Sequence, residues 1–163
     1  MIIFLSARVH PGETPSSYVM RGIVKFLLSM KDCRARILRD YFVFKIIPMI
    51  NPDGVYQGYF RMDTLNQNLN RFYSAPDLDK QPAIYCISQL IKQYSQEKKI
   101  FFYCDLHAHG GKKGTFLYGN AYKKFYQQVE TQLFAKIVSL NSINFEYISC
   151  KFEKKHMKTK VII

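Results

Sequence analysis

The chain has 163 residues, of which 48% are hydrophobic and 15% aromatic, and it carries a formal net charge of +12. This length suits one domain with a hydrophobic core, and the composition excludes a chain that is disordered throughout. The positive charge favours an anionic partner, which can be a nucleic acid, an acidic membrane surface or an acidic polypeptide.

Cysteine usage and the N-terminus bear on the compartment. The four cysteines lie far apart and form no Cys-x-x-Cys pair, which favours free thiols in a reducing compartment over a disulfide framework. The apolar residues 1–5 lack a basic flank and run into Arg8 and His10, so we expect them to be neither a signal peptide nor a membrane span. We therefore expect a soluble, cytoplasmic protein without a membrane partner.

The first half of the chain begins with residues 2–6, a short apolar and β-branched run that predicts a buried strand. Thr14-Pro15 predicts the start of a helix, with Thr14 as its N-cap, and apolar residues follow at near-helical spacing up to residue 27. A second strand-like run, residues 41–50, ends at Asn51-Pro52-Asp53-Gly54, a strong turn signal.

The second half begins with a polar segment, residues 55–79, which predicts a loop. Pro82 opens a helix with apolar residues on one side, and residues 100–106 form a third strand-like run that stops at His107. Residues 115–118 suggest a short strand. Residues 121–140 predict a helix with an apolar residue at every fourth position, namely Phe125, Val129, Leu133 and Ile137.

Alternating strands and helices predict an α/β fold, with a twisted, mostly parallel or mixed sheet flanked by helices. In such sheets ligands bind beyond the carboxyl ends of the strands. The polar clusters at residues 8–13, 51–54 and 105–113 each lie at or just after the end of a predicted strand. The sequence therefore predicts a functional site at this edge of the sheet.

Three residues at this edge predict a metal site. His10 and Glu13 are three residues apart, close to one turn, so both side chains can reach one ion, and His107 follows another predicted strand. Two histidines and one glutamate around zinc leave a fourth position open for water, which is the arrangement of a hydrolytic site. A His-x-x-Glu pattern alone is a weak signal, and its context strengthens it.

That context consists of four motifs, at residues 6–14, 48–54, 69–71 and 105–110. In order and spacing they resemble the M14 zinc carboxypeptidases, specifically the cytosolic carboxypeptidase branch and, within it, the type-5 group. The resemblance implies that residues 1–163 are an incomplete zinc-carboxypeptidase catalytic domain. The branch's N-terminal β-sandwich domain and the C-terminal part of its catalytic domain are expected outside this segment.

The resemblance also implies roles for individual residues. His10, Glu13 and His107 are expected to bind one zinc ion per chain. Arg61 is expected to polarise the scissile carbonyl and stabilise the oxyanion, for which a fixed guanidinium is well suited. Asn70 and Arg71 are expected to bind the terminal α-carboxylate of the substrate, because the planar arginine fork matches a carboxylate.

Members of this branch remove glutamate, C-terminal or at a branch point, from acidic protein tails such as those of polyglutamylated tubulin. Such a polyanionic substrate suits the net charge of +12. Lys113, beside Lys112, is expected to pair with the side chain of the substrate's glutamate; the alternative is that both are solvated loop lysines. No nucleic-acid recognition motif accompanies the positive charge, so a nucleic-acid partner is not expected.

Four further residues stand near the expected ligands. Asp105 and Asp53 suit the orientation of ligand imidazoles, although Asp53 fits better as the cap of its own turn. Asn68 occupies a position where many M14 enzymes carry an aspartate paired with the first histidine, which leaves that pairing open here. His109 is expected to lie outside the ligand set.

The general-base glutamate of the family is expected beyond residue 163, since Glu146 and Glu153 lie in no matching context. Two alternatives to a zinc carboxypeptidase therefore stay open. One is a catalytically inactive segment that binds zinc and acidic tails. The other is an aspartoacylase-like zinc amidohydrolase, a class that shares the two-histidine, one-glutamate site.

Overall fold

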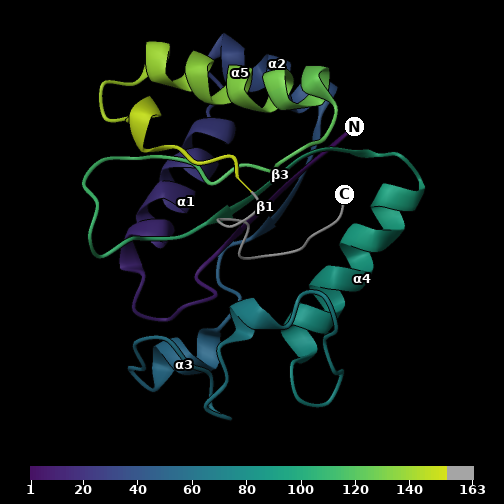
Figure 1. Cartoon of the computed structure of the whole chain (residues 1–163), viewed down its shortest axis with the longest axis vertical. Coiled ribbons are helices and arrows are strands. Elements are labelled where there is room, and N and C mark those ends of the chain that lie inside the picture. Colours follow the sequence, from purple (N-terminus) through teal and green to yellow (C-terminus); the bar gives the residue numbers. More distant parts are fainter. Residues whose placement is uncertain (154–163) are drawn as a thin grey trace. The chain divides into compact units, whose positions relative to one another are not determined.

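A computed structural model describes residues 1–153, and its centre is a three-stranded sheet flanked by helices (Figure 1). The strands are β1 (Ile2–Ala7), β2 (Val43–Ile47) and β3 (Ile100–Leu106). They lie in the order β2-β1-β3, and both pairings are parallel. The predicted α/β class with a parallel sheet is confirmed.

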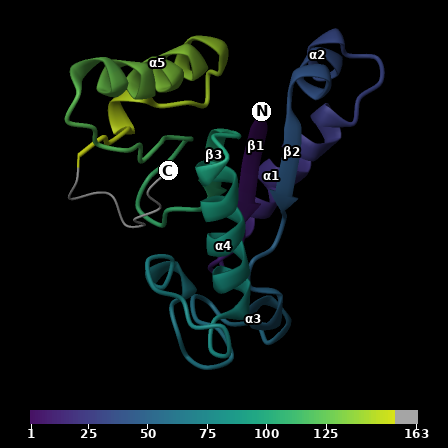
Figure 2. The ribbon, with the colours of Figure 1, turned by 90° about the vertical axis from the view of Figure 1, so that its right-hand side faces the viewer.

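Alternate residues of β1 face two separate cores, because successive side chains of a strand point to opposite faces of a sheet. Phe4 packs in one core with isoleucines of α4 (Pro82–Gln96), and Leu5 and Ala7 pack in the other with Met20 of α1 (Thr14–Leu27). Helices α1 and α4 therefore cover opposite faces of the sheet (Figure 2).

In the first 80 residues, three short helical segments were not predicted: α2 (Cys33–Tyr41), α3 (Pro52–Tyr56) and the 3₁₀ turn η1 (Leu69–Arg71). The segment predicted as a loop, residues 55–79, contains all of η1 and the end of α3. The prediction of Thr14 as the N-cap of α1 is wrong by one residue. Glu13 holds that position and makes no side-chain cap.

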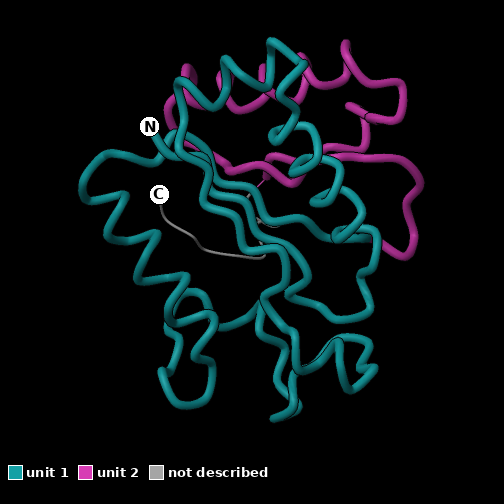
Figure 3. Tube along the Cα trace, turned by 180° about the vertical axis from the view of Figure 1, so that it is seen from behind, with its two compact units in different colours: residues 1–108, 161–163 teal, residues 109–160 magenta. Residues whose placement is uncertain are grey.

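The chain divides into two compact units, residues 1–108 and, within the described chain, residues 109–153 (Figure 3). The second unit contains α5 (Phe125–Asn141) and the 3₁₀ turn η2 (Tyr147–Ser149). The short strand predicted at residues 115–118 is wrong. Thr115 and Tyr118 instead form two isolated bridges, to Phe145 and Lys151 respectively.

Helix α5 carries an apolar stripe that faces solvent. Phe125 is 84% exposed and Leu140 is 73% exposed. The stripe, called the α5 stripe below, consists of Phe125, Val129, Leu133, Ile137 and Leu140. Neither α5 nor any other helix in the described part of the chain is long and apolar enough to cross a membrane.

Candidate metal centre

The candidate centre lies where β1 and β3 end. His10 and Glu13 belong to the turn between β1 and α1, and His107 directly follows β3. Because β1 and β3 are parallel neighbours, their carboxyl ends meet at one edge of the sheet. The chain leaves β1 for β2 on one side and reaches β3 on the other, so this edge is a topological switch point, where α/β proteins bind ligands.

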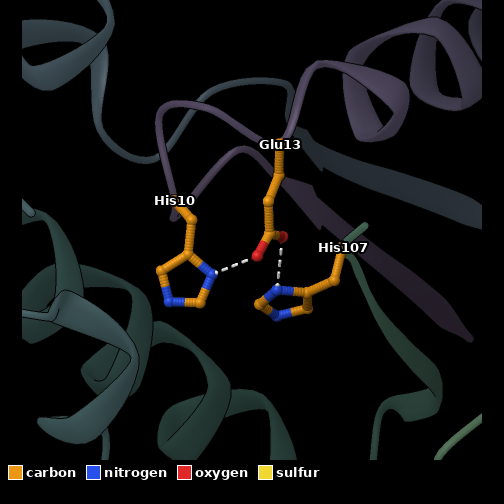
Figure 4. A group of neighbouring side chains, drawn as sticks. All are labelled: His10, Glu13 and His107. Carbon is orange, nitrogen blue, oxygen red and sulfur yellow. Dashed lines mark hydrogen bonds and ion pairs between the residues drawn. The ribbon is translucent and has the colours of Figure 1, made fainter. Parts of the chain in front are cut away.

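The three side chains converge as predicted (Figure 4). His10 Nδ1 lies 2.8 Å from Glu13 Oε1, and His107 Nδ1 lies 2.9 Å from Glu13 Oε2. One ligand atom from each residue lies within 4.8 Å of the other two. Two imidazole nitrogens and one carboxylate are a donor set that zinc accepts.

The outer ring nitrogens of both histidines are also held. Nε2 of His10 lies 3.0 Å from Oδ1 of Asn68, and Nε2 of His107 lies 2.8 Å from Oδ2 of Asp105. These oxygens accept hydrogen bonds from Nε2–H, so on each ring it is Nδ1 that faces Glu13, where a metal can take the place of the proton shared with the carboxylate. The sequence left open whether Asn68 pairs with the first histidine, and the structure shows that it does. The residues of the site fit a zinc ion.

The charges of the site are coupled. Burial alone would raise the pKa of Glu13, but hydrogen bonds from His10, His107 and the Ala108 N–H outweigh burial and hold that pKa well below its usual range. Burial alone would lower the pKa of His107, yet its bonds to Asp105 and Glu13 raise it to about 9. The carboxylate of Glu13 is thus charged and ready to bind a cation.

Arg8 shapes the turn that carries the first two candidate ligands. Its backbone is left-handed, with φ at 62°, a conformation that is uncommon outside glycine and costs about 1–3 kcal/mol where it is strained. Its guanidinium holds the turn by donating to Pro11 O at 2.7 Å and to Ser17 Oγ at 2.7 Å. Sequence reasoning missed this role, because nothing in the residue types alone indicates it.

Asn51 joins three backbone segments near the centre and is almost fully buried. Its Oδ1 accepts from Gly54 N–H at 2.9 Å, and its Nδ2 donates to Val9 O at 3.4 Å and Met62 O at 3.3 Å. Asp53 is exposed. The turn-capping role predicted for Asp53 therefore belongs to Asn51.

Arg61 lies beside the candidate ligands. Its Nη1 is 3.7 Å from Glu13 Oε1, and its loop is fixed to the metal turn by a hydrogen bond of 2.8 Å from Gly12 N–H to Phe60 O. Residues 59–64 and 66 line an open cavity of about 460 Å³. The structure thus brings Arg61 beside the group formed by His10, Glu13 and His107.

Asn70 and Arg71 lie in η1, which is attached to the centre through Asn68. The Asn68 Oδ1 atom that accepts from His10 also accepts from Asn70 N–H at 3.1 Å. Arg71 is exposed, and its Nη1 donates to Asn70 O at 3.2 Å. One side chain therefore orients both His10 and the predicted carboxylate-binding pair.

The other basic candidates belong to the second unit. Lys112 donates to Ser149 O at 3.0 Å, and its Nζ lies 4.3 Å from the centre of the Phe116 ring, whereas Lys113 is exposed. His109 also belongs to this unit. The possible metal-binding group found among residues 1–153 does not include it.

Known proteins resemble this chain over most of its length. The family model described as zinc carboxypeptidase matches residues 1–158. Cytosolic carboxypeptidase 6 of Mus musculus is 41% identical over 96% of this chain and 29% of its own length. Cytosolic carboxypeptidase-like protein 5 of Danio rerio is 30% identical over 96% of this chain and 28% of its own length. The chain thus spans less than a third of these relatives.

Solved structures show the same fold. A putative carboxypeptidase A from Shewanella denitrificans superimposes with a TM-score of 0.84 and 28% identity, covering 97% of this chain and 43% of its own. A metallo-carboxypeptidase from Burkholderia cenocepacia gives a TM-score of 0.80 and 26% identity, again covering 97% of this chain and 43% of its own. With its fold, its converging histidines and glutamate and the family model in agreement, the chain belongs to the zinc carboxypeptidase family.

Proposed function

We propose that this chain supplies the zinc-binding and substrate-binding groups of a metallocarboxypeptidase. The observation that carries the proposal is the convergence of His10, Glu13 and His107 within 4.8 Å, at the shared ends of β1 and β3. The hydrogen bonds on both outer ring nitrogens support it, because metal-binding histidines almost always donate from the second nitrogen.

The chemistry divides among named side chains. His10, Glu13 and His107 would hold a zinc ion, which would supply an activated water molecule and polarisation of the scissile carbonyl. Arg61, 3.7 Å from Glu13, donates to the oxyanion as charge develops there, and Arg71 binds the substrate's α-carboxylate together with Asn70. A positioned acid–base group adds about 10²–10⁴ in rate, and none of these three residues transfers that proton.

The proposed substrate is a polypeptide tail that ends in glutamate, such as the polyglutamylated tail of tubulin. Support comes from the net charge of +12, from the guanidinium groups of Arg61 and Arg71, and from the exposed Lys113, which is assigned to the side chain of the terminal glutamate. The word "cytosolic" in the names of the relatives supports a cytoplasmic location.

Peptide binding tests the substrate-binding groups. We expect the zinc-loaded chain to bind a glutamate-ended peptide, and to bind its C-terminally amidated form at least tenfold more weakly, since a charge-assisted bond worth about 1.5–3 kcal/mol is lost. Arg71→Ala should abolish this difference. Arg36→Ala, which removes another exposed arginine, in α2, should retain it. Equal binding of the two peptides by the unaltered chain contradicts the assignment of Arg71.

Release of free glutamate from a polyglutamylated tubulin-tail peptide separates catalysis from binding. From the 163-residue chain alone we expect binding with little or no release, because no group assigned to the site shuttles the proton. Robust zinc-dependent release that His10→Ala abolishes would mean that another residue of this chain is the base. Hydrolysis of an N-acyl amino acid, with no action on peptides, would instead identify an amidohydrolase.

A further inference from the structure

Ser6 is a buried polar residue in an otherwise apolar strand. It lies on β1 between Leu5 and Ala7, and its exposed fraction is 0%. Because strand side chains alternate, Ser6 shares its face of the sheet with Phe4, whose mainly apolar core includes isoleucines of α4 and is bordered by Tyr103. A buried hydroxyl in such surroundings is costly unless it makes a hydrogen bond.

The partner of Ser6 is the carboxylate that orients His107. The parallel register places Ser6 directly beside Asp105 on β3. Ser6 Oγ donates to Asp105 Oδ1 at 2.7 Å, while Asp105 Oδ2 accepts from His107 Nε2 at 2.8 Å. The two oxygens of one carboxylate are therefore held from opposite ends, and the Asp105 side chain is only 11% exposed.

Distances show which contact of Ser6 dominates. Its Oγ lies 3.5 Å from the hydroxyl of Tyr103, at the outer limit of a hydrogen bond, whereas 2.7 Å to Asp105 is the usual length for a hydroxyl donor. Bonds from a hydroxyl to a carboxylate are also about twice as strong as bonds between neutral groups. The hydroxyl of Ser6 is thus committed to Asp105.

We propose that Ser6 is a positioning residue of the metal centre, acting through Asp105 to fix the ring of His107 with Nδ1 toward the metal. The inference rests on the proposed function, in that His107 is taken as a zinc ligand. Without the Ser6 hydroxyl, the Asp105 carboxylate can rotate about its last side-chain bond. The ring of His107 then loses its fixed orientation.

Zinc affinity of the full chain, measured by competition with a chromophoric chelator, tests this role. Loss of an outer partner of a metal ligand costs about 10–100-fold in affinity, so we expect Ser6→Ala to bind zinc about tenfold more weakly. Ser88→Ala is the matched control, because it removes a half-buried hydroxyl that donates to Tyr73 O at 3.3 Å. Its affinity should equal that of the unaltered chain, and equal affinity of Ser6→Ala would overturn the proposal.

A double-mutant cycle separates positioning from a merely structural effect. If Ser6 acts through Asp105, then Ser6→Ala should cause no further loss of zinc affinity once Asp105→Ala has removed the acceptor. Equal losses with and without Asp105 would show that Ser6 supports the fold only, and would overturn the proposal. Where Ser6→Ala does not fold, Ser6→Cys takes its place, because the thiol fills the space and is a weaker donor. Its zinc affinity should also be lower than that of the unaltered chain.

The His10→Ala variant reports zinc taken up elsewhere on the chain, for instance by the exposed thiols of Cys33 and Cys86. An unaltered chain that binds no more tightly than His10→Ala would reject the metal centre itself, and the role of Ser6 with it. Tight binding that needs His10 but is unaffected by Ser6→Ala would reject the role of Ser6 alone.

Discussion

The two histidines of the centre differ in what orients them. His107 donates to the carboxylate of Asp105 at 2.8 Å, whereas His10 donates to the neutral amide oxygen of Asn68 at 3.0 Å. A charged acceptor forms the stronger bond and raises the basicity of the ring more. His107 is therefore expected to be the stronger donor to a metal, and a charged acceptor beside His10 is expected to strengthen that ring as a donor too.

Asn68→Asp and Asn68→Ala test this difference. The aspartate retains an acceptor for His10 and for Asn70 N–H, so zinc affinity should stay equal or rise. The alanine removes both bonds, and affinity should fall about tenfold. Asn141→Ala, which removes a side-chain bond to the carbonyl of Ile137 at the end of α5, is the control and should change nothing. A loss of affinity in Asn68→Asp as large as in Asn68→Ala would contradict this account.

The sequence indicated the expected ligands and one of their outer partners, Asp105, but not the residues that hold the site from further away. His10, Glu13 and His107 follow strand ends, so the topology of an α/β sheet is enough to bring them together. Ser6 and Asn51 act through bonds to residues 99 and 42 positions away, respectively. Such bonds depend on strand register and loop path, which no local pattern specifies.

At the scale of elements, the turn that carries His10 and Glu13 packs against the loop that carries Arg61. A Cβ added to Gly12 would lie 2.7 Å from both the ring and the carbonyl oxygen of Phe60. The Gly12 N–H also donates to that oxygen. Only a residue without a side chain allows this close approach, so Gly12 sets the distance between the metal turn and Arg61.

Gly12→Ala should therefore lower the free energy of unfolding by about 1–3 kcal/mol, the usual cost of overpacking. Gly22→Ala is the matched control within α1, where an added Cβ meets nothing within 4 Å. Because alanine is the better helix former, this variant should gain about 0.5–1 kcal/mol. Urea titrations measure the free energy of unfolding of both variants. If Gly12→Ala leaves that free energy unchanged, then the metal turn and the loop of Arg61 separate easily.

The predicted elements succeeded where apolar periodicity was strong. Strand β1 and the helices α1 and α4 bury apolar residues, and β2 and β3 half-bury theirs, so the apolar pattern reveals all five elements. Helix α2 was missed because Ala35 is its one buried residue, and it depends instead on the cap formed by Asp32 with Arg34 N–H. The strand expected at residues 115–118 forms only isolated bridges, since pairing needs a neighbour that composition does not reveal.

At the scale of the whole molecule, all the proposed ligands and their outer partners belong to the unit of residues 1–108. Zinc that binds the folded state stabilises it in proportion to RT ln(1 + [L]/Kd). We expect zinc to slow amide hydrogen exchange in residues 8–13, 68–71 and 105–108, and to leave α5 unchanged. Hydrogen–deuterium exchange with and without a chelator measures this, and equal slowing in α5 would show that metal binding orders both units.

The α5 stripe has a practical consequence for the behaviour of the chain in solution. Exposed apolar side chains attract one another between molecules, while a net charge of +12 repels them. Salt shortens the range of that repulsion, to about 10 Å at 0.1 M and about 3 Å at 1 M. The second osmotic virial coefficient from static light scattering should therefore turn from positive to negative as salt is added. Leu133→Glu should delay that change of sign, so the chain is best concentrated at low ionic strength.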